Sequence, residues 1–250
     1  MDETDAGVTE DRILGGRVLL RQPAKGYRAG VDAALLAAAC DAGAGERVLE
    51  AGCGVGAVLL AAAARRADAR FVGIERDSAA AALARANIAL NGLGERVEVH
   101  AGDIDTGLAA TWRGAFDAAL ANPPFFDDPA ALRAPDPAKS GAWMADGGLT
   151  AWCGALVAAV RDGGTITLIH RADRLADILA LLGEKAGSFQ IRPIHPFADA
   201  PAKRVIVRAV RGGRAPLQLL PPLVLHERGG AKHGAQAEAI LRGEAALTWR

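Results

Sequence analysis

The stretch RVLEAGCGVGAVLL, residues 47–60, decides the fold of this 250-residue chain. A short apolar run leads into three glycines at alternate positions, and an alanine- and leucine-rich run follows Gly56. A buried strand and a helix are expected on either side of such a turn. Glycines let the backbone approach a bound group closely, and the first turn of the following helix offers free N–H donors. We therefore predict a small-molecule site at this turn of an α/β domain.

Further β-rich runs alternate with alanine-rich helical stretches, which is typical of a parallel sheet covered by helices on both faces. The predicted strands are 47–51, 70–75, 96–100, 116–121 and 163–169. Beyond residue 187, two β-branched runs without a long helix between them predict an antiparallel pair at one edge of the sheet. Residues 12–30 predict a small hairpin that leads into a helix starting near Asp32.

Length and composition predict a single domain over residues 12–250, preceded by an acidic, disordered tail over residues 1–11. The 29 basic and 29 acidic residues cancel, so overall charge favours neither a nucleic acid nor a membrane partner. The N-terminus lacks the basic start of a secretory signal, and the apolar runs are shorter than a spanning helix. Three widely spaced cysteines do not have metal-ligand spacing. We expect a cytoplasmic protein without a metal, as a monomer or a homodimer.

The glycine turn by itself is compatible with two cofactors. With Ala57 in the last position it fits the dinucleotide fingerprint, and Glu75 follows Gly52 by 23 residues, as expected for a ribose-binding acid. Glu50, which only Ala51 separates from the first glycine of the turn, would repel a pyrophosphate but would suit an ammonium group. Glu50 therefore favours S-adenosylmethionine over a nicotinamide cofactor. Asp103 also follows a predicted strand, although such acids equally often cap helices or turns.

The segment ALANPPFF, residues 119–126, ends the fourth predicted strand abruptly. Each proline fixes its own φ and biases the preceding residue towards extended backbone, so Asn122 and Pro123 are held together. Together with LEAGCGVG, VGIER, AGD and the upstream GYRAGVDAALLAAA, this segment resembles the class I S-adenosylmethionine-dependent methyltransferases. More narrowly, the chain is similar to the methyltransferase small branch, which contains the bacterial enzymes that methylate adenine N6 in valine tRNA. The resemblance covers about residues 12–242.

The resemblance implies a Rossmann-like, mostly parallel seven-stranded sheet with an N-terminal hairpin extension. It assigns the catalytic site to Asn122, Pro123, Pro124 and Phe125, with the Asn122 side chain and the Pro123 carbonyl receiving the substrate nitrogen and Phe125 or Phe126 stacking on the base. It implies cofactor contacts from Arg28, Asp32, Glu50, Gly52, Gly54, Gly56, Glu75 and Asp103. For Asp32, capping of the following helix is an equally good interpretation.

An RNA substrate requires local positive charge. Lys203, Arg204, Arg208 and Arg211 form a run without an acid, and Arg12, Arg17, Arg21, Lys25 and Arg28 recur across the hairpin. A solvated face is an equally good interpretation of such a run. The long polar segment 127–149 is typical of a functional or mobile loop, and we expect it to close over substrate. His170 and His195 fall near strand ends, where a structural role is the more common one.

These features predict methyl transfer from S-adenosylmethionine to an exocyclic adenine nitrogen in RNA, and in particular in tRNA. A guanine amino group or a protein glutamine amide would suit the same motif, because both present a planar nitrogen. A non-catalytic RNA-binding module is an alternative that leaves the glycine turn without a purpose. A nicotinamide-dependent oxidoreductase leaves NPPFF unexplained.

Overall fold

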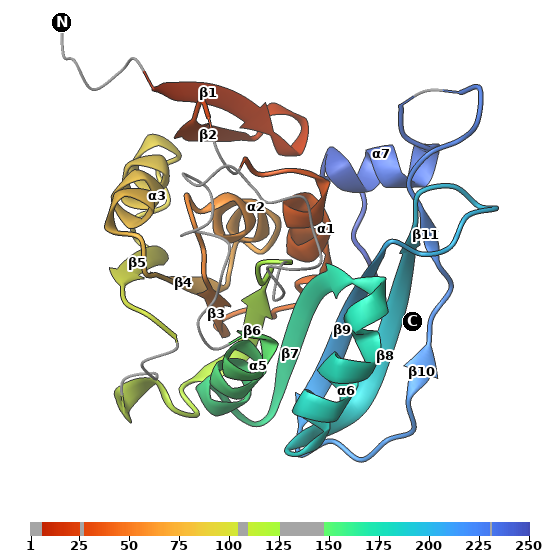
Figure 1. Ribbon diagram of the computed structural model, residues 1–250. Helices are drawn as coiled ribbons and strands as arrows, with labels where there is room; N and C mark the ends of the chain where they lie inside the picture. Colours follow the sequence, from red (N-terminus) through yellow and green to blue (C-terminus); the bar gives the residue numbers. More distant parts are fainter. Residues whose placement is uncertain (1–6, 26–27, 105–109, 126–147, 231) are drawn as a thin grey trace, which may run out of the picture.

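A mixed β-sheet crosses the centre of the protein, with helices packed on both of its faces (Figure 1). The computed structural model describes residues 7–25, 28–104, 110–125, 148–230 and 232–250. The seven long strands are β3 (Arg47–Ala51), β4 (Arg70–Glu75), β5 (Val97–Ala101), β6 (Phe116–Ala121), β7 (Val160–Arg171), β8 (Ala186–His195) and β9 (Arg204–Arg211). Two short strands, β10 (Gln218–Leu219) and β11 (Leu223–Val224), pair parallel with β8.

The strand order is β10-β8-β9-β7-β6-β3-β4-β5. Strands β3 to β7 run parallel to one another, and β9 lies antiparallel between β7 and β8. The predicted mostly parallel sheet with an antiparallel pair towards one edge is therefore confirmed, but among the described residues β10 and β11 extend the predicted seven strands to nine. The order reverses at β3, whose neighbours are β4 on one side and β6 on the other, so a crevice opens beyond the carboxyl end of β3.

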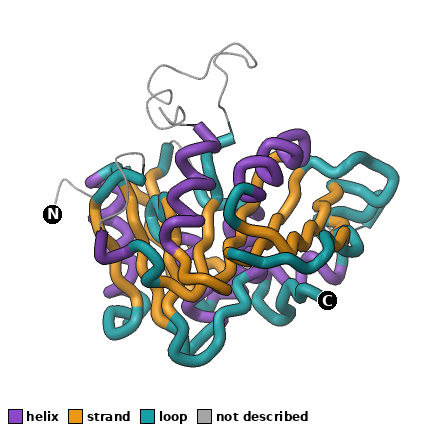
Figure 2. Tube along the Cα trace, turned by 90° about the horizontal axis from the view of Figure 1, so that it is seen from below, coloured by secondary structure: helices purple, strands orange, loops and turns teal. Residues whose placement is uncertain are grey.

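Each face of the sheet has its own apolar core. One core joins the sheet to α1 (Val31–Ala39), α2 (Ala57–Arg65), α3 (Ser78–Leu90) and α7 (Ala235–Leu241). The other joins it to α5 (Gly148–Ala159) and α6 (Leu175–Gly183), and Figure 2 shows helices above and below the strands. Short 3-10 turns at Leu14–Gly16, Ala110–Trp112 and Ala172–Arg174 complete the described elements. Among the described residues, no helix has the length and apolar character needed to cross a membrane.

The predicted N-terminal hairpin forms from β1 (Val8–Ile13) and β2 (Val18–Pro23), packed against α3 and α2. The predicted tail over 1–11 was too long, because the strand already begins at Val8, where alternate residues are partly buried; residues 1–6 lie outside the described residues. Asn87 on α3 and Asn91 at its C-cap bind the free edge of β2: Asn87 pairs with the backbone N–H and C=O of Arg21, and Asn91 with those of Leu19. The two side-chain amides thus make the hydrogen bonds that the backbone of a neighbouring strand would otherwise make with β2.

The start of α1 differs from the capping interpretation of Asp32. Gly30 occupies the N-cap position, and Asp32 lies in the first helical turn, where a carboxylate interacts favourably with the helix dipole. Asp77, at the start of α3, is a true N-cap whose side chain accepts hydrogen bonds from Ala79 and Ala80. The Asp32 side chain is therefore available for another partner.

Candidate cofactor and substrate site

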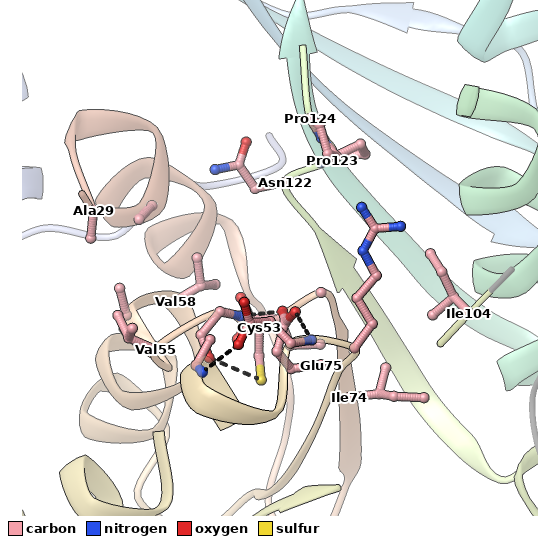
Figure 3. Close-up of a pocket in the computed structure, with 18 of the residues that line it drawn as sticks. Ala29, Cys53, Val55, Val58, Ile74, Glu75, Ile104, Asn122, Pro123 and Pro124 are labelled. Atoms are coloured by element: carbon pink, nitrogen blue, oxygen red, sulfur yellow. Dashed lines mark hydrogen bonds between the residues drawn. The ribbon is translucent and has the colours of Figure 1, made fainter. Parts of the chain in front are cut away.

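A pocket of about 350 Å³ lies at the carboxyl ends of β3, β4, β5 and β6, beside the point where the strand order reverses (Figure 3). It brings together most of the residues singled out from the sequence. Those that line it are Asp32, Glu50, Gly52, Gly54, Glu75, Asp103, Asn122, Pro123, Pro124 and Phe125. One concave site therefore contains both the glycine turn and the NPPF segment, which are separated by more than 60 positions in the chain.

Two predicted cofactor residues do not line the pocket. Gly56 adopts a left-handed conformation (φ 89°) as the N-cap of α2 and faces Ala84 of α3, so its role is to turn the chain. Arg28 is turned towards the hairpin, where it donates hydrogen bonds to Thr9, Asp11 and the Pro23 carbonyl. The assignments of both residues as cofactor contacts are corrected by this geometry.

The glycine turn is held from two sides. Gly52 has a φ of 66°, and a β-carbon there would lie only 2.9 Å from Cζ3 of Trp152 on α5. The Gly54 N–H donates to Glu75 Oε2 at 2.8 Å, and Glu75 Oε1 accepts from Asp77 N at 2.9 Å. Glu75 therefore shapes the turn as well as lining the pocket, as the dashed bonds in Figure 3 show. Trp152 was not foreseen, because its contact with Gly52 joins elements 100 residues apart.

Glu50 is the strongest electrostatic feature of the pocket. Its side chain is 98 % buried, and its Oε2 atom has no hydrogen-bond partner among the described residues. Burial raises the pKa of this carboxyl well above its ordinary value, and the nearby Glu75 carboxylate adds to the effect. A buried, unsatisfied carboxylate is costly unless a cation joins it. The pocket is thus suited to a ligand with a positive group, such as the ammonium of S-adenosylmethionine, and unsuited to a pyrophosphate.

Cys53 also lines the pocket, but burial raises the pKa of its thiol, so it stays protonated. A protonated thiol is a poor nucleophile, and no covalent step at Cys53 is indicated. Among the described residues, no group of three or more His, Cys, Asp or Glu side chains is arranged to hold a metal ion.

The NPPF segment leaves the end of β6 and rises over the pocket, with Asn122 on one side and the two prolines on the other (Figure 3). The Phe125 ring lies below the guanidinium of Arg204, and the edge of His170 meets it at 5.1 Å between ring centres. Arg204 in turn donates to Asp32 at 3.1 Å. His170 is therefore a buried packing partner of the motif. His195, held by the Ala200 carbonyl, stabilises a turn after β8.

The predicted basic run on β9 does not form one open surface. Arg208 binds Asp41 and Gln190, and Arg211 binds Asp162, the carbonyl of Val157 on α5 and that of Val160 at the start of β7. Arg211 is also about 23 Å along the strand from Arg204, at the opposite end of the sheet from the pocket. Arg208 and Arg211 are thus structural, Arg204 contacts the pocket-lining residues Asp32 and Phe125, and Lys203 is exposed next to Arg204 in the chain. Phe126 and nearly all of segment 127–149 lie outside the described residues.

Residues 28–134 match the family model of the methyltransferase small domain. The tRNA1(Val) (adenine(37)-N6)-methyltransferase of Porphyromonas gingivalis W83 is 39% identical over 115 residues, 44% of each chain. The enzyme of the same description from Serratia proteamaculans is 36% identical over 107 residues, 42% of this chain and 41% of that one. The chain spans less than half the length of the curated relatives it matches.

Solved structures agree on the fold. A protein of Agrobacterium tumefaciens, described as a predicted O-methyltransferase, superposes with a TM-score of 0.72 at 28% identity, over 86% of this chain and 98% of that one. A Thermus thermophilus 16S rRNA N2 G1207 methyltransferase, in complex with AdoMet and guanosine, superposes with a TM-score of 0.59 at 23% identity, over 82% of this chain and 50% of that one. The predicted Rossmann-like α/β fold is confirmed.

Proposed function

We propose that this chain, a Rossmann-like protein whose residues 28–134 match the model of the methyltransferase small domain, methylates the exocyclic N6 nitrogen of an adenine in tRNA. S-adenosylmethionine would supply the methyl group. One observation carries the proposal: Asn122 and Pro123 share a pocket with the buried carboxylate of Glu50 and the glycine turn. The curated relatives, which are described as tRNA1(Val) adenine-N6 enzymes, support tRNA as the substrate. We accordingly assign the protein to the cytoplasm.

The residues that would hold the cofactor divide the pocket between them. Glu50 would face the ammonium group, and Gly52 and Gly54 would let the backbone lie against the methionine part. Glu75 would receive the ribose hydroxyls while still holding the Gly54 N–H. Asp103, on the same wall after β5, would accept from the adenine amino group.

The NPPF segment would activate the substrate. An adenine amine is a poor nucleophile because its lone pair is delocalised into the ring. Two acceptors directed at its hydrogens, the Asn122 Oδ1 atom and the Pro123 carbonyl, favour a tetrahedral nitrogen with a localised lone pair. The proline rings fix the backbone that carries the Pro123 carbonyl, so the acceptors need no reorganisation during the reaction. No general base is required, since the methylated, cationic nitrogen readily loses its proton to water.

Alignment supplies the rest of the rate enhancement. Holding two reactants in an attack geometry can contribute about 7 to 11 kcal/mol. Phe125 lines the same pocket and offers a ring on which the base can stack. A base inside a structured loop must be turned outward to reach this site, at a cost of a few kcal/mol that contacts elsewhere on the RNA must offset.

The experiment that tests the proposal uses purified protein, radiolabelled S-adenosylmethionine and total tRNA from a strain that lacks the gene, followed by digestion to nucleosides. Label in N6-methyladenosine is the expected result, and the Asn122→Ala variant is the negative control. Label in N2-methylguanosine would replace the adenine proposal with methylation of a guanine amino group. Label that stays with protein after ribonuclease treatment would replace it with methylation of a glutamine amide. If S-adenosylmethionine does not raise the melting temperature of the wild-type protein, the cofactor assignment is overturned.

A further inference from the structure

A second hollow lies away from the pocket, between the turn after β8 and the loop after β11. It is lined by Phe197, His226, Glu227, Arg228, Gly229 and Lys232. Its aromatic side chains form a continuous series. The ring centres of Phe197 and His226 are 5.6 Å apart, and His226 stacks on His233 with 5.1 Å between ring centres and 24° between ring planes. The Arg228 guanidinium lies over Phe197 at 4.5 Å. We call Phe197, His226, Arg228, Lys232 and His233 the ring patch.

The ring patch lies at the same end of the sheet as the pocket. Strand β8 is antiparallel to β9, which is antiparallel to β7, so the carboxyl end of β8 lies at the edge where β6 delivers Asn122. Three strand spacings separate β8 from β6, which corresponds to about 14 Å across the sheet. The loop between β11 and α7, which contributes residues 226–230, 232 and 233, lies at the upper right of Figure 1. The patch and the pocket therefore lie beyond the carboxyl ends of strands, at the same end of the sheet.

The charges of the patch are accessible to a ligand. Lys232 is exposed, and Arg228 is 66% exposed in an ion pair with the equally exposed Asp199. An exposed pair of this kind contributes little stability, so a phosphate can compete with Asp199 for Arg228. Lys203 is exposed in the turn after β8 and adds a further cation next to Ile194. By contrast, Arg208 and Arg211 on β9 are held by partners of their own.

We propose that the ring patch binds the single-stranded RNA that flanks the target base. Flat rings that can stack on bases, combined with cations that follow a phosphate backbone, are the recognition chemistry of unpaired nucleic acid. The inference rests on the proposed function, since it supplies the contacts that offset the turning out of the adenine. It also moves the RNA-binding surface from the β9 strand to the two loops beyond β8 and β11.

The test separates the patch from the reaction by using an RNA that cannot be methylated on adenine. Fluorescence anisotropy with a labelled oligouridine measures binding alone, and tRNA methylation measures KM and kcat. Phe197→Ala and Arg228→Ala should each raise the oligouridine Kd about tenfold, and should raise KM for tRNA with kcat and cofactor Kd unchanged. Lys232→Ala should lower the salt dependence of binding by about one charge.

Two matched controls keep the result specific. Arg161→Ala removes an exposed, ion-paired arginine at the opposite end of the sheet, and Leu219→Ala removes an exposed apolar side chain on β10. Neither should change RNA binding, and thermal melting verifies that all variants fold. The proposal that the ring patch binds RNA would be overturned by wild-type oligouridine affinity in both Phe197→Ala and Arg228→Ala, or by an equal loss of affinity in Arg161→Ala. If the wild-type protein binds oligouridine through the patch but methylates no tRNA, the proposed reaction fails and the patch stands.

Discussion

The Arg204 guanidinium carbon lies 4.5 Å from the centre of the Phe125 ring, and the same guanidinium donates to Asp32 at 3.1 Å. A helix residue, a strand residue and the aromatic residue of the NPPF segment are thereby joined at the mouth of the pocket. His170 meets the same ring edge-on. The orientation of Phe125 is therefore set by elements that reach it from the antiparallel side of the sheet.

Replacing Arg204 with alanine should raise KM for the RNA substrate about three- to tenfold, because the cation–π contact that holds Phe125 is lost. Cofactor affinity should not change, and Arg204→Lys, which keeps the cation, should recover part of the loss. Steady-state methylation kinetics and calorimetric titration of the cofactor measure the two quantities. Arg208→Ala, on the same strand but ion-paired to Asp41, is the control. An equal KM effect in the control would refute a specific role for Arg204.

Asn122→Ala should reduce kcat by about 10² to 10³, because one of two preorganised acceptors is removed. The cofactor Kd should remain near that of the wild type. Asn122→Asp keeps an acceptor oxygen and should retain more activity than the alanine variant. Single-turnover methylation with saturating cofactor checks this order, and wild-type turnover in Asn122→Ala would remove Asn122 from the mechanism.

Cofactor binding should be pH-dependent through Glu50. Burial raises the pKa of Glu50 in the folded, ligand-free protein, so the folded state holds a proton that the unfolded state has released. The stability of the ligand-free protein should therefore fall as pH rises from the ordinary glutamate pKa through the raised one. A cationic ligand favours the charged carboxylate, so its affinity should rise with pH over the same window.

Glu50→Gln should abolish this pH dependence, raise the melting temperature of the ligand-free protein at neutral pH, and weaken cofactor binding. Calorimetric titration in buffers of different ionisation enthalpy counts the proton released on binding. Glu98→Gln, an exposed acid on β5, is the matched control and should behave as the wild type. A Glu50→Gln variant with wild-type cofactor affinity would contradict the ammonium assignment.

Local pattern was sufficient to predict the parallel strands, since each pairs a short apolar run with a turn signal. The strand predicted over 116–121 has those bounds in the structure, whereas β7 begins three residues before the predicted 163 because Val160 already pairs with Phe116. Glycine spacing and the proline pair likewise predicted the two halves of the pocket. Site residues that belong to these local motifs could therefore be predicted from the sequence.

Ion pairs between residues far apart in the chain could not be predicted from the sequence. The basic run on β9 gave no sign that Asp41 and Asp162 would neutralise Arg208 and Arg211, because ion pairs between distant segments leave no periodicity. Likewise, no local pattern indicated that Arg28 would form an ion pair with Asp11 of the hairpin. The tail boundary was wrong because VTEDRI carries three charges, yet its strand needs only one partly buried face against β2.

Asn87→Ala should destabilise the protein by about 2 to 4 kcal/mol, because the fully buried Asn87 amide is the hydrogen-bond partner of the Arg21 N–H and C=O and of the Val55 carbonyl. Asn91→Ala should cost about 1 kcal/mol, since that side chain is only partly buried and water can replace it. Urea unfolding measures both values. Similar losses in the two variants would mean that the hairpin is held mainly by its apolar contacts.

Gly52→Ala should destabilise the protein strongly, for two separable reasons. The φ of 66° is unfavourable for any residue with a β-carbon, and that carbon would overlap the Trp152 ring. Gly54→Ala, with a φ of 53° and open space around it, carries only the first cost and should fold with weakened cofactor binding.

A double-mutant cycle with Trp152→Leu separates the two costs of Gly52→Ala. The smaller leucine removes the overlap but not the strain, so Gly52→Ala should be less destabilising in that background, with a coupling energy of about 1 to 3 kcal/mol. Urea unfolding of the four proteins supplies the cycle. Additive losses would show that Gly52 is required for its backbone conformation alone, and that Trp152 packs against the turn without limiting what can occupy it.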